Sequence, residues 1–399
     1  MSLDVRSIQR ADVYKAGHFA ATLQRVNGGT EFSYLATYDG PAVATTLPRT
    51  TDPFITPAGA VPAFFAGLLP EGRRFSSLQR AIKTSADDEL SLLLAVGSDT
   101  IGDVVIVPHG DSTSREASLV TVDTNFDEIH FSDLMSDAGI VDKVGLPGIQ
   151  EKVSARVISL PLSTPTDRFI LKLNPPEFPH VVENEAFFLE LARSAGLPVV
   201  DATLVYDNTG TAGLLVRRFD RASSSESEPK SIACEDACQL LNLWPGDKYN
   251  VSSEALTHRV YDLCASSSVA IRDVFRQLCF AWITGNGDVH AKNISLLEHA
   301  SNEWRVAPAY DLPSTLFYGD YSMALSIDNR TTGLSRRRWL EFAHSIGLAQ
   351  KVAERIIDHL LAATTDLSSV IRGGVLPFDD KTNRDSARNI ANRQKQLAA

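Results

Sequence analysis

An apolar helix face that runs into a polar loop and then a hairpin constrains this chain more than any other feature. Apolar residues recur with i, i+3, i+4 spacing between Ile271 and Ile283, which predicts a helix with one buried face. Gly285 follows, and glycine readily takes the left-handed conformation that ends a helix. Residues 294–298 and 303–306 are typical of two short strands around a polar turn. The loop 285–293 is therefore expected between a buried helix and a hairpin.

The loop carries side chains with a shared chemistry. Its sequence is Gly-Asn-Gly-Asp-Val-His-Ala-Lys-Asn, and Asp311 follows the hairpin that returns the chain. A kinase-type phosphoryl-transfer site needs a carboxylate that accepts the proton of the substrate hydroxyl, and Asp288 could supply it. It also needs oxygen ligands for magnesium, which the amide of Asn293 and the carboxylate of Asp311 could supply. Asn-Gly-Asp alone is an ordinary turn signal, so this interpretation needs the other half of such a site elsewhere in the chain.

A strand lysine and a helix glutamate supply that other half. Residues 169–173 (Phe-Ile-Leu-Lys-Leu) predict a strand whose period of two puts Ile170 and Lys172 on the face opposite the other three residues. Glu185 opens a predicted helix that runs to about Gly196, and it heads the apolar stripe of that helix. A buried carboxylate needs a charge partner. Lys172 is the nearest candidate, and kinases use such a pair to position ATP phosphates.

Two further segments surround this strand. Before it, Gly145 and Gly148 lie in a turn that leads into a candidate strand, and backbone amides in such a turn can approach phosphate closely. The segment contains neither a Gly-x-Gly-x-x-Gly nor a Gly-x4-Gly-Lys-Ser/Thr pattern. After it, residues 214–221 read as a strand that continues into a polar segment, where a hinge to a second lobe is expected.

In these residues the chain resembles the HipA-like serine/threonine kinases, the toxin components of bacterial type II toxin–antitoxin pairs. The resemblance covers nearly the whole chain. It rests on these motifs: Phe64-Phe-Ala-Gly-Leu-Leu-Pro-Glu-Gly72, Gly97-Ser-Asp-Thr-Ile-Gly102, Gly148-Ile-Gln-Glu-Lys152, Ile170-Leu-Lys172, Glu183-Asn-Glu185, Arg218-Phe-Asp-Arg221, Glu235-Asp-Ala-Cys-Gln239 with Lys248-Tyr249, Asp288 to Asn293, and Tyr310-Asp311.

The resemblance implies a fold and a role for each matching residue. The expected fold is α+β: a two-lobed, protein-kinase-like fold with a β-rich N-lobe, a mostly helical C-lobe and an extra N-terminal α/β subdomain. The expected cofactors are ATP and Mg²⁺. The expected site residues are Asp288 as base with His290 and Lys292 beside it (catalytic); Gly145, Gly148, Gln150, Lys152, Lys172, Glu185 and backbone groups of Arg217 and Phe219 (ATP); and Asn293 and Asp311 (metal).

The resemblance also implies partners. Some members phosphorylate aminoacyl-tRNA synthetases, so the expected substrate is a cytosolic protein, and the expected partner is a HipB-like helix-turn-helix antitoxin that contacts DNA. Many members carry a serine at the start of the phosphate loop, whose autophosphorylation displaces the loop. Gly145 occupies that position here and has no hydroxyl to modify.

Composition limits the environment of the protein. The chain has 399 residues, of which 44% are hydrophobic and 22% charged, as in globular proteins that fold in water. Its apolar runs are too short to span a bilayer, so we expect no membrane contact and a cytoplasmic location. The net charge of −11 argues against a broad nucleic-acid surface, so DNA contact is expected only through a partner. The cysteines are expected to be reduced packing residues, with Cys234 and Cys238 one turn apart on a helix.

The expected organisation is an N-terminal subdomain (1–108), a connecting segment (109–139), a kinase N-lobe (140–221) and a helical C-lobe (222–399). Two other functions fit the motifs. The Asp-x-His-x-x-Asn pattern of the loop is nearer to lipid-kinase-like loops, which permits a small-molecule or lipid-type kinase. The third possibility is a non-catalytic module that binds the antitoxin as a co-repressor. The presence of all five residues that the chemistry needs argues against it, since a decayed kinase usually loses one of them: Lys172, Glu185, Asp288, Asn293 and Asp311.

Overall fold

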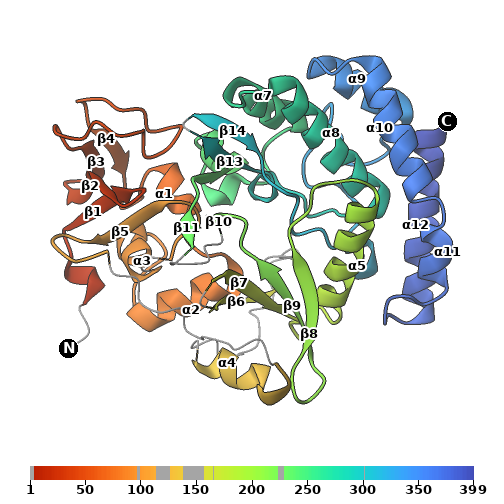
Figure 1. Ribbon diagram of the computed structural model, residues 1–399, viewed down its shortest axis with the longest axis horizontal. Coiled ribbons are helices and arrows are strands. Elements are labelled where there is room, and N and C mark those ends of the chain that lie inside the picture. The colour runs from red at the N-terminus through yellow and green to blue at the C-terminus, as the bar shows by residue number, and fades with distance from the viewer. Residues whose placement is uncertain are drawn as a thin grey trace.

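The computed structural model describes residues 4–96, 99–113, 126–137, 157–164, 166–222, 229–300 and 302–399. Figure 1 shows three parts: a strand-rich N-terminal unit (residues 4–108) at the left, a second sheet at the lower centre and a helical part at the right. Each part combines helices with an antiparallel sheet, so the α+β class expected from the sequence is confirmed.

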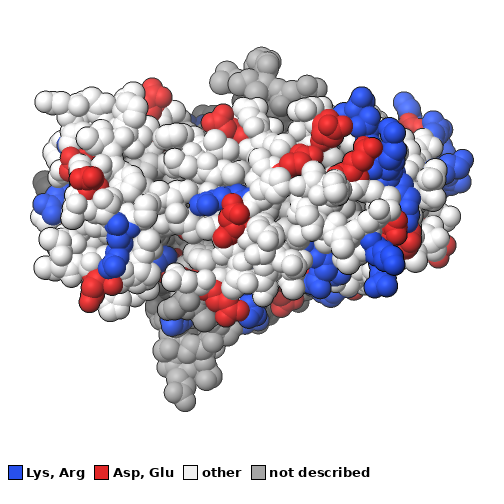
Figure 2. All heavy atoms as spheres, turned by 90° about the horizontal axis from the view of Figure 1, so that it is seen from above, with Lys and Arg blue, Asp and Glu red and all other residues white. Residues whose placement is uncertain are grey.

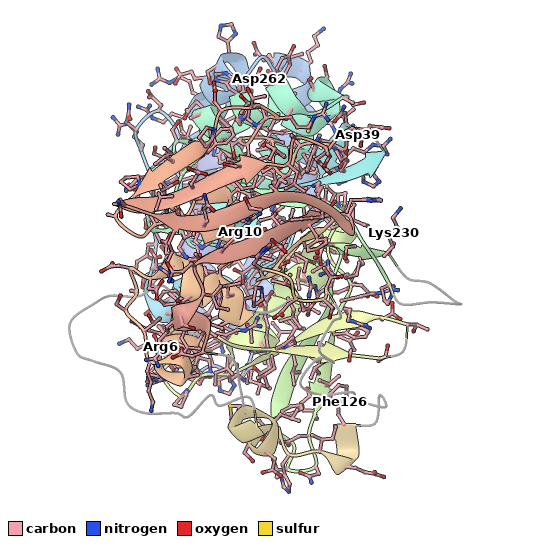
Figure 3. All side chains as sticks on the ribbon, turned by 90° about the vertical axis from the view of Figure 1, so that its left-hand side faces the viewer. Arg6, Arg10, Asp39, Phe126, Lys230 and Asp262 are labelled. Atoms are coloured by element: carbon pink, nitrogen blue, oxygen red, sulfur yellow. The ribbon has the colours of Figure 1, made fainter. Side chains whose placement is uncertain are left out.

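The N-terminal unit is built on an antiparallel sheet with strand order β4-β3-β2-β1-β5. Its sheet faces the viewer in Figure 3, where Arg10 marks β1. Its elements are η1 (Val5–Ser7), β1 (Arg10–Lys15), β2 (His18–Val26), β3 (Gly29–Tyr34), β4 (Phe54–Pro57), α1 (Ala63–Gly67), α2 (Gly72–Ile82), α3 (Glu89–Val96) and β5 (Val104–Pro108). Strand β3 ends at Tyr34, and the amide of Tyr38 then bonds to the Leu35 oxygen at 3.0 Å and closes a turn.

The central part is a second antiparallel sheet with strand order β6-β7-β9-β8. Its elements are η2 (Phe126–Glu128), α4 (Phe131–Asp137), β6 (Ile158–Ser163), β7 (Arg168–Leu173), α5 (Val181–Ser194), β8 (Ala202–Tyr206) and β9 (Ala212–Arg217). Leu160 and Leu171 bury one face against Phe131 of α4. Leu214 lies on the opposite face, where it joins the core beneath α5 and pairs with Lys172 on β7. The two faces predicted for 169–173 are therefore confirmed.

The C-terminal part is mostly helical around the buried helix α8. Its elements are β10 (Arg221–Ala222), β11 (Lys230–Ser231), β12 (Cys234–Asp236), α6 (Ala237–Leu240), η4 (Pro245–Asp247), α7 (Ser253–Leu263), α8 (Ser267–Thr284), η5 (Ala291–Asn293), β13 (Ser295–Ala300), β14 (Glu303–Val306), η6 (Thr315–Tyr318), α9 (Arg336–Ser345), α10 (Gln350–Ala363), α11 (Leu367–Arg372) and α12 (Asp380–Ala398). Gly285 ends α8 with φ of 75°, and an added Cβ would lie 2.3 Å from Leu316, so both the cap and the predicted hairpin are confirmed.

Two local expectations were wrong. Helix α5 begins at Val181, so Glu185 lies one turn inside the helix rather than at its start. Cys234 and Cys238 do not share a helical turn, because Cys234 pairs with Leu297 in β12 and the helix begins only at Ala237. All four cysteines are nevertheless free and buried, as expected.

The expected boundaries at residues 108, 139 and 221 stay predictions. Parts of the connecting segment 109–139 lie outside the described residues, but its helix α4 packs on the β6–β7 face of the central sheet. Across the described ranges, no helix combines the length and the apolar character that crossing a bilayer requires.

Candidate active site

Five of the predicted site residues line one cavity of about 320 Å³: Lys172, Glu185, Arg217, Phe219 and Lys292. The central sheet, the segment 217–220, the β12–β14 sheet and the N-terminal unit all contribute to its wall. The lining residues include Gly67, Leu69, Glu71, Arg74, Asp99, Ile101, Ile170, Lys172, Glu185, Val216, Arg217, Phe219, Asp236, Lys292 and Tyr310. Apolar and charged side chains both line this cavity, and a concave site where polar groups converge is a usual setting of a small-molecule site.

Lys172 lies at the centre of an ionic cluster in this cavity. Its ammonium donates to both carboxylate oxygens of Glu185, at 2.8 and 2.9 Å, and to Oδ1 of Asp311 at 3.0 Å. The predicted contact between Lys172 and Glu185 is thus present. Burial acts to lower the pKa of Lys172, but the carboxylates of Asp311 and Glu185 outweigh it and raise the pKa above its ordinary value. Two carboxylates face one ammonium, so the cluster suits an added cation.

Asn293 and Asp311 lie next to each other, as the hairpin argument predicts. The amide nitrogen of Asn293 donates to Oδ2 of Asp311 at 2.8 Å, and its oxygen accepts the backbone amide of His290 at 3.1 Å. Asp311 has φ of 56°, a left-handed conformation that costs free energy in residues other than glycine. Asn286 bonds to the Asp311 carbonyl at 3.2 Å and helps to hold this backbone.

Asp288 is buried beside a tyrosine. Its side chain is 1% exposed, and Oδ1 accepts a hydrogen bond from the hydroxyl of Tyr249 at 3.0 Å. The backbone amide of Asp288 bonds to Asn286 Oδ1 at 2.9 Å, which fixes the loop. Burial and the neighbouring Asp288 carboxylate raise the pKa of Tyr249, so this tyrosine remains a donor. The sequence singled out Tyr249 only within a family motif, because nothing local indicates its contact with Asp288.

His290 is buried without a hydrogen bond at either ring nitrogen within the described chain. Its ring packs edge-on against Tyr249, with centroids 5.1 Å apart. Burial, and then the charge of Lys248, lower the pKa of His290 to about 3. A neutral imidazole with unused polar atoms is rare inside a protein, and it is expected where a ligand supplies the partner.

Lys292 points toward the N-terminal unit. Its ammonium lies 3.0 Å from Oε1 of Glu71 and donates to the Gly67 carbonyl at 3.2 Å. Its backbone carbonyl accepts the hydroxyl of Tyr310 at 2.5 Å. The cavity therefore includes Lys292, as expected, but also Glu71, whose contact with it no sequence pattern indicates.

Of the two backbone positions predicted to hold a nucleotide base, only one has an unused amide. The amide of Arg217 donates to the Asp201 carbonyl at 2.8 Å, so a role of the Arg217 backbone in binding the base, which stays a prediction, would fall to its carbonyl. The amide of Phe219 makes no hydrogen bond within the described ranges, and its ring packs on Tyr310 with centroids 5.3 Å apart. Four other predicted ATP residues, Gly145, Gly148, Gln150 and Lys152, lie outside the described residues.

The hinge segment carries a buried ionic network that also reaches the N-terminal unit. Asp220 accepts from Arg218 at 2.7 Å and Arg221 at 2.5 Å, and also from the backbone amide of Gly102 at 2.9 Å. Both arginines contact Asp99. Arg74 of helix α2 also lines the cavity. The N-terminal unit is therefore one wall of the site.

Comparison with known protein families decides the identity of the fold. The family described as the HipA-like C-terminal domain matches residues 144–367, and the HipA N-terminal domain matches residues 11–107. The chain belongs to the HipA family. The serine/threonine-protein kinase toxin HipA of Shewanella oneidensis is 25% identical over 366 residues, which cover 84% of this chain and 82% of that protein. Y4mE of Sinorhizobium fredii is 29% identical over 345 residues, or 81% of each chain.

A solved structure confirms the expected architecture. HipA of Shewanella oneidensis, determined with HipB and operator DNA, superposes with a TM-score of 0.76 and covers 97% of each chain at 19% identity. At this identity the match establishes the fold, which is the HipA kinase-like fold with its N-terminal domain. Lys172, Glu185, Asn293 and Asp311 therefore meet in a family whose fold is kinase-like.

Proposed function

We propose that this HipA-family protein is an ATP-dependent serine/threonine protein kinase of the toxin type. The observation that carries the proposal is the contact set in which Lys172 bridges Glu185 and Asp311 while Asn293 bonds to Asp311. A lysine–glutamate pair, a metal-binding carboxylate and an asparagine are the positioning and electrostatic parts of phosphoryl transfer. Glu185 holds Lys172 beside the cavity, where its ammonium would bind ATP phosphates.

Asp288 is proposed as the group that accepts the proton of the substrate hydroxyl. It lies five residues before Asn293 on the same buried loop, and Tyr249 fixes one carboxylate oxygen. His290 is neutral, and its ring nitrogens make no hydrogen bond in the described part of the chain, so one of them would donate to a phosphate oxygen. Phe219 would hold the base through its unused amide, with Ile101 of the N-terminal unit and Val216 at the same cavity wall.

The residues present fit magnesium. Asp311 and Asn293 offer carboxylate and amide oxygens, which are the hard donors that Mg²⁺ prefers, and one further carboxylate (Glu185) lies in the same cluster. The Asn293 oxygen accepts the His290 amide in this structure, so the carboxamide must turn to present its oxygen beside Asp311. When bound, the ion would neutralise the triphosphate charge.

The partner proposal rests on the family and on charge. We infer a HipB-like helix-turn-helix antitoxin that makes the main DNA contacts, since the solved relative was determined with HipB and operator DNA. The present chain is acidic, which suits a basic partner. Lysines and arginines gather at the right-hand end in Figure 2. Of the arginines on α9, Arg336 and Arg338 are paired with Asp358 and Asp328.

The direct test is labelling of a bacterial lysate with radioactive ATP and magnesium, beside an Asp288→Ala control. One labelled protein, absent with the control, is expected and would identify the substrate, with an aminoacyl-tRNA synthetase as the first candidate. Label that appears only in small molecules would replace the proposal with a small-molecule or lipid-type kinase. ATP binding without any transfer would leave a non-catalytic co-repressor module.

A further inference from the structure

Glu71 is an acidic residue of the N-terminal unit that contacts the loop carrying the proposed catalytic groups. It precedes α2 and lines the cavity. One carboxylate oxygen accepts from the ammonium of Lys248 at 2.6 Å, and the other lies 3.0 Å from the ammonium of Lys292. Both lysines belong to the C-terminal part, so one carboxylate joins two distant segments of that part to the N-terminal unit.

The charges around Glu71 keep it ionised. Burial acts to raise the pKa of Glu71, but the ammonium groups of Lys292 and Lys248 outweigh burial and lower the pKa to about 2. Burial acts to lower the pKa of Lys292, but the Glu71 carboxylate outweighs burial and raises this pKa above its ordinary value. Asp236 lies 3.9 Å from Lys292 on the other side. The cluster is therefore a fixed set of charges at neutral pH rather than a titrating switch.

The loop that Lys292 belongs to is held from several directions. Tyr310 bonds to the carbonyl of Lys292, and Asn293, the next residue, bonds to Asp311. Glu71 and the Gly67 carbonyl hold the side chain of Lys292. Without the Glu71 carboxylate, Lys292 would keep a carbonyl partner and the more distant Asp236, so its ammonium could turn into the cavity.

Other contacts hold the N-terminal unit in place independently of Glu71. Glu235 accepts from the amide and the hydroxyl of Thr45 at 2.8 and 2.7 Å. Gln239 donates to the Phe64 carbonyl at 2.9 Å, and the hinge network joins Asp220 to Gly102. Removing the charge of Glu71 should therefore leave the two parts docked, which separates a role in positioning from a role in docking.

We propose that Glu71 is a positioning residue for phosphoryl transfer, which fixes Lys292 and the 290–293 loop from the N-terminal unit. The inference rests on the proposed kinase function. It makes the N-terminal unit part of the active site, so that the kinase parts would be incomplete without it. Because misplacing a catalytic group by about 1 Å costs about 100-fold in rate, the charge should matter for turnover more than for ATP binding.

The test is Glu71→Gln in the full chain, which removes the charge and keeps the shape, with Glu177→Gln as the matched control. Glu177 also forms an ion pair with the N-terminal unit, through Arg73 at 2.6 Å, but it does not line the cavity. The readouts are kcat, KM for ATP and the thermal midpoint. Glu71→Gln is expected to lower kcat at least about tenfold with KM for ATP changed less than about threefold. Glu177→Gln should change neither by more than about twofold.

The conservative variant Glu71→Asp keeps the charge and is expected to recover part of the lost kcat. The inference would be overturned if the thermal midpoint of Glu71→Gln fell in step with its activity and Glu71→Asp recovered none of the lost kcat. That result would assign Glu71 to docking of the N-terminal unit. Equal kcat values for Glu71→Gln and Glu177→Gln, measured beside an active wild-type protein, would also overturn the inference. A wild-type protein that binds ATP but transfers no phosphoryl group would instead overturn the proposed function, and the inference with it.

Discussion

Single side chains explain most of the site, and Lys172 is the first of them. Its ammonium neutralises two buried carboxylates, Glu185 and Asp311, which would otherwise repel each other. The pair with Glu185 was predictable because a lysine on a strand and an acid on a helix stripe each need a partner. The contact of Lys172 with Asp311 was not predicted, because the hairpin argument placed Asp311 only beside the loop that carries Asn293. The contact of Glu71 with Lys292 could not, since no local pattern links such distant positions.

Lys172→Ala should weaken the productive placement of ATP. The substitution removes the ammonium that would bind phosphates, so KM for ATP is expected to rise at least about tenfold, which corresponds to about 1.4 kcal/mol. Steady-state turnover against ATP concentration measures this effect. Lys230→Ala, a change of the same type at an exposed lysine on β11, serves as the control. Normal turnover at ordinary ATP concentrations would show that Lys172 does not contact the nucleotide.

His290 should stay neutral over the physiological pH range. Burial and nearby lysine charge lower its pKa to about 3, so protonation occurs only well below the ordinary histidine range. We expect the imidazole NMR signals of His290, assigned with a His290→Gln variant, to be constant between pH 5 and 8. A titration with a midpoint near pH 6.5 would contradict the buried environment described for this residue.

At the scale of elements, α5 and the segment after Asp311 are locked together. Asn184, fully buried on α5, donates to the Ser314 carbonyl at 3.1 Å and accepts the Ser314 amide at 2.8 Å. Asn184 precedes Glu185, so the helix that carries Glu185 is tied to the segment that carries Asp311. The sequence predicted the helix from its periodicity, but not this pairing, because an asparagine on a helix gives no sign of its partner.

Asn184→Ala should destabilise the fold and reduce activity. It leaves a buried amide and a buried carbonyl of Ser314 without partners, and each such group costs about 1–3 kcal/mol. Urea denaturation is expected to show a loss of about 2–4 kcal/mol. Asn389→Ala, which removes a single hydrogen bond to Asp385 on α12, should cost less than about 1.5 kcal/mol. Equal losses in the two variants would mean that the Ser314 contacts are not formed.

At the scale of the whole molecule, ionised acids lie where the N-terminal unit contacts the kinase-like part. Glu71, Asp99 and Asp220 all have lowered pKa values: burial opposes ionisation in each, and neighbouring lysines or arginines overcome it. The N-terminal subdomain and both lobes were expected from the resemblance to the HipA-like kinases, which rests on the order of the motifs. The hinge network was not, since its partners come from the Asp99–Gly102 segment, and only the folded chain shows that they meet Arg218 and Arg221.

This arrangement predicts a pH dependence of stability with a defined sign. The folded-state pKa of Glu71 is about 2, below its ordinary value, so its ionised form stabilises the folded state. Its contribution is complete above about pH 4.5 and is lost as the pH falls toward 2. The difference in unfolding free energy between the wild-type protein and Glu71→Gln should therefore shrink between pH 5 and pH 3. A difference that stays constant over this range would contradict the ion pairs of Glu71.

The central claim is that Asp288 and its neighbours transfer a phosphoryl group from ATP. It is tested most directly by measuring phosphate transfer and ATP affinity together for the wild-type protein, Asp288→Ala and Asp262→Ala, a change at an exposed acid of the same part (Figure 3). We predict that Asp288→Ala loses at least about 100-fold in transfer while its ATP affinity stays within about threefold, and that Asp262→Ala matches the wild type. Undiminished transfer by Asp288→Ala would contradict the account.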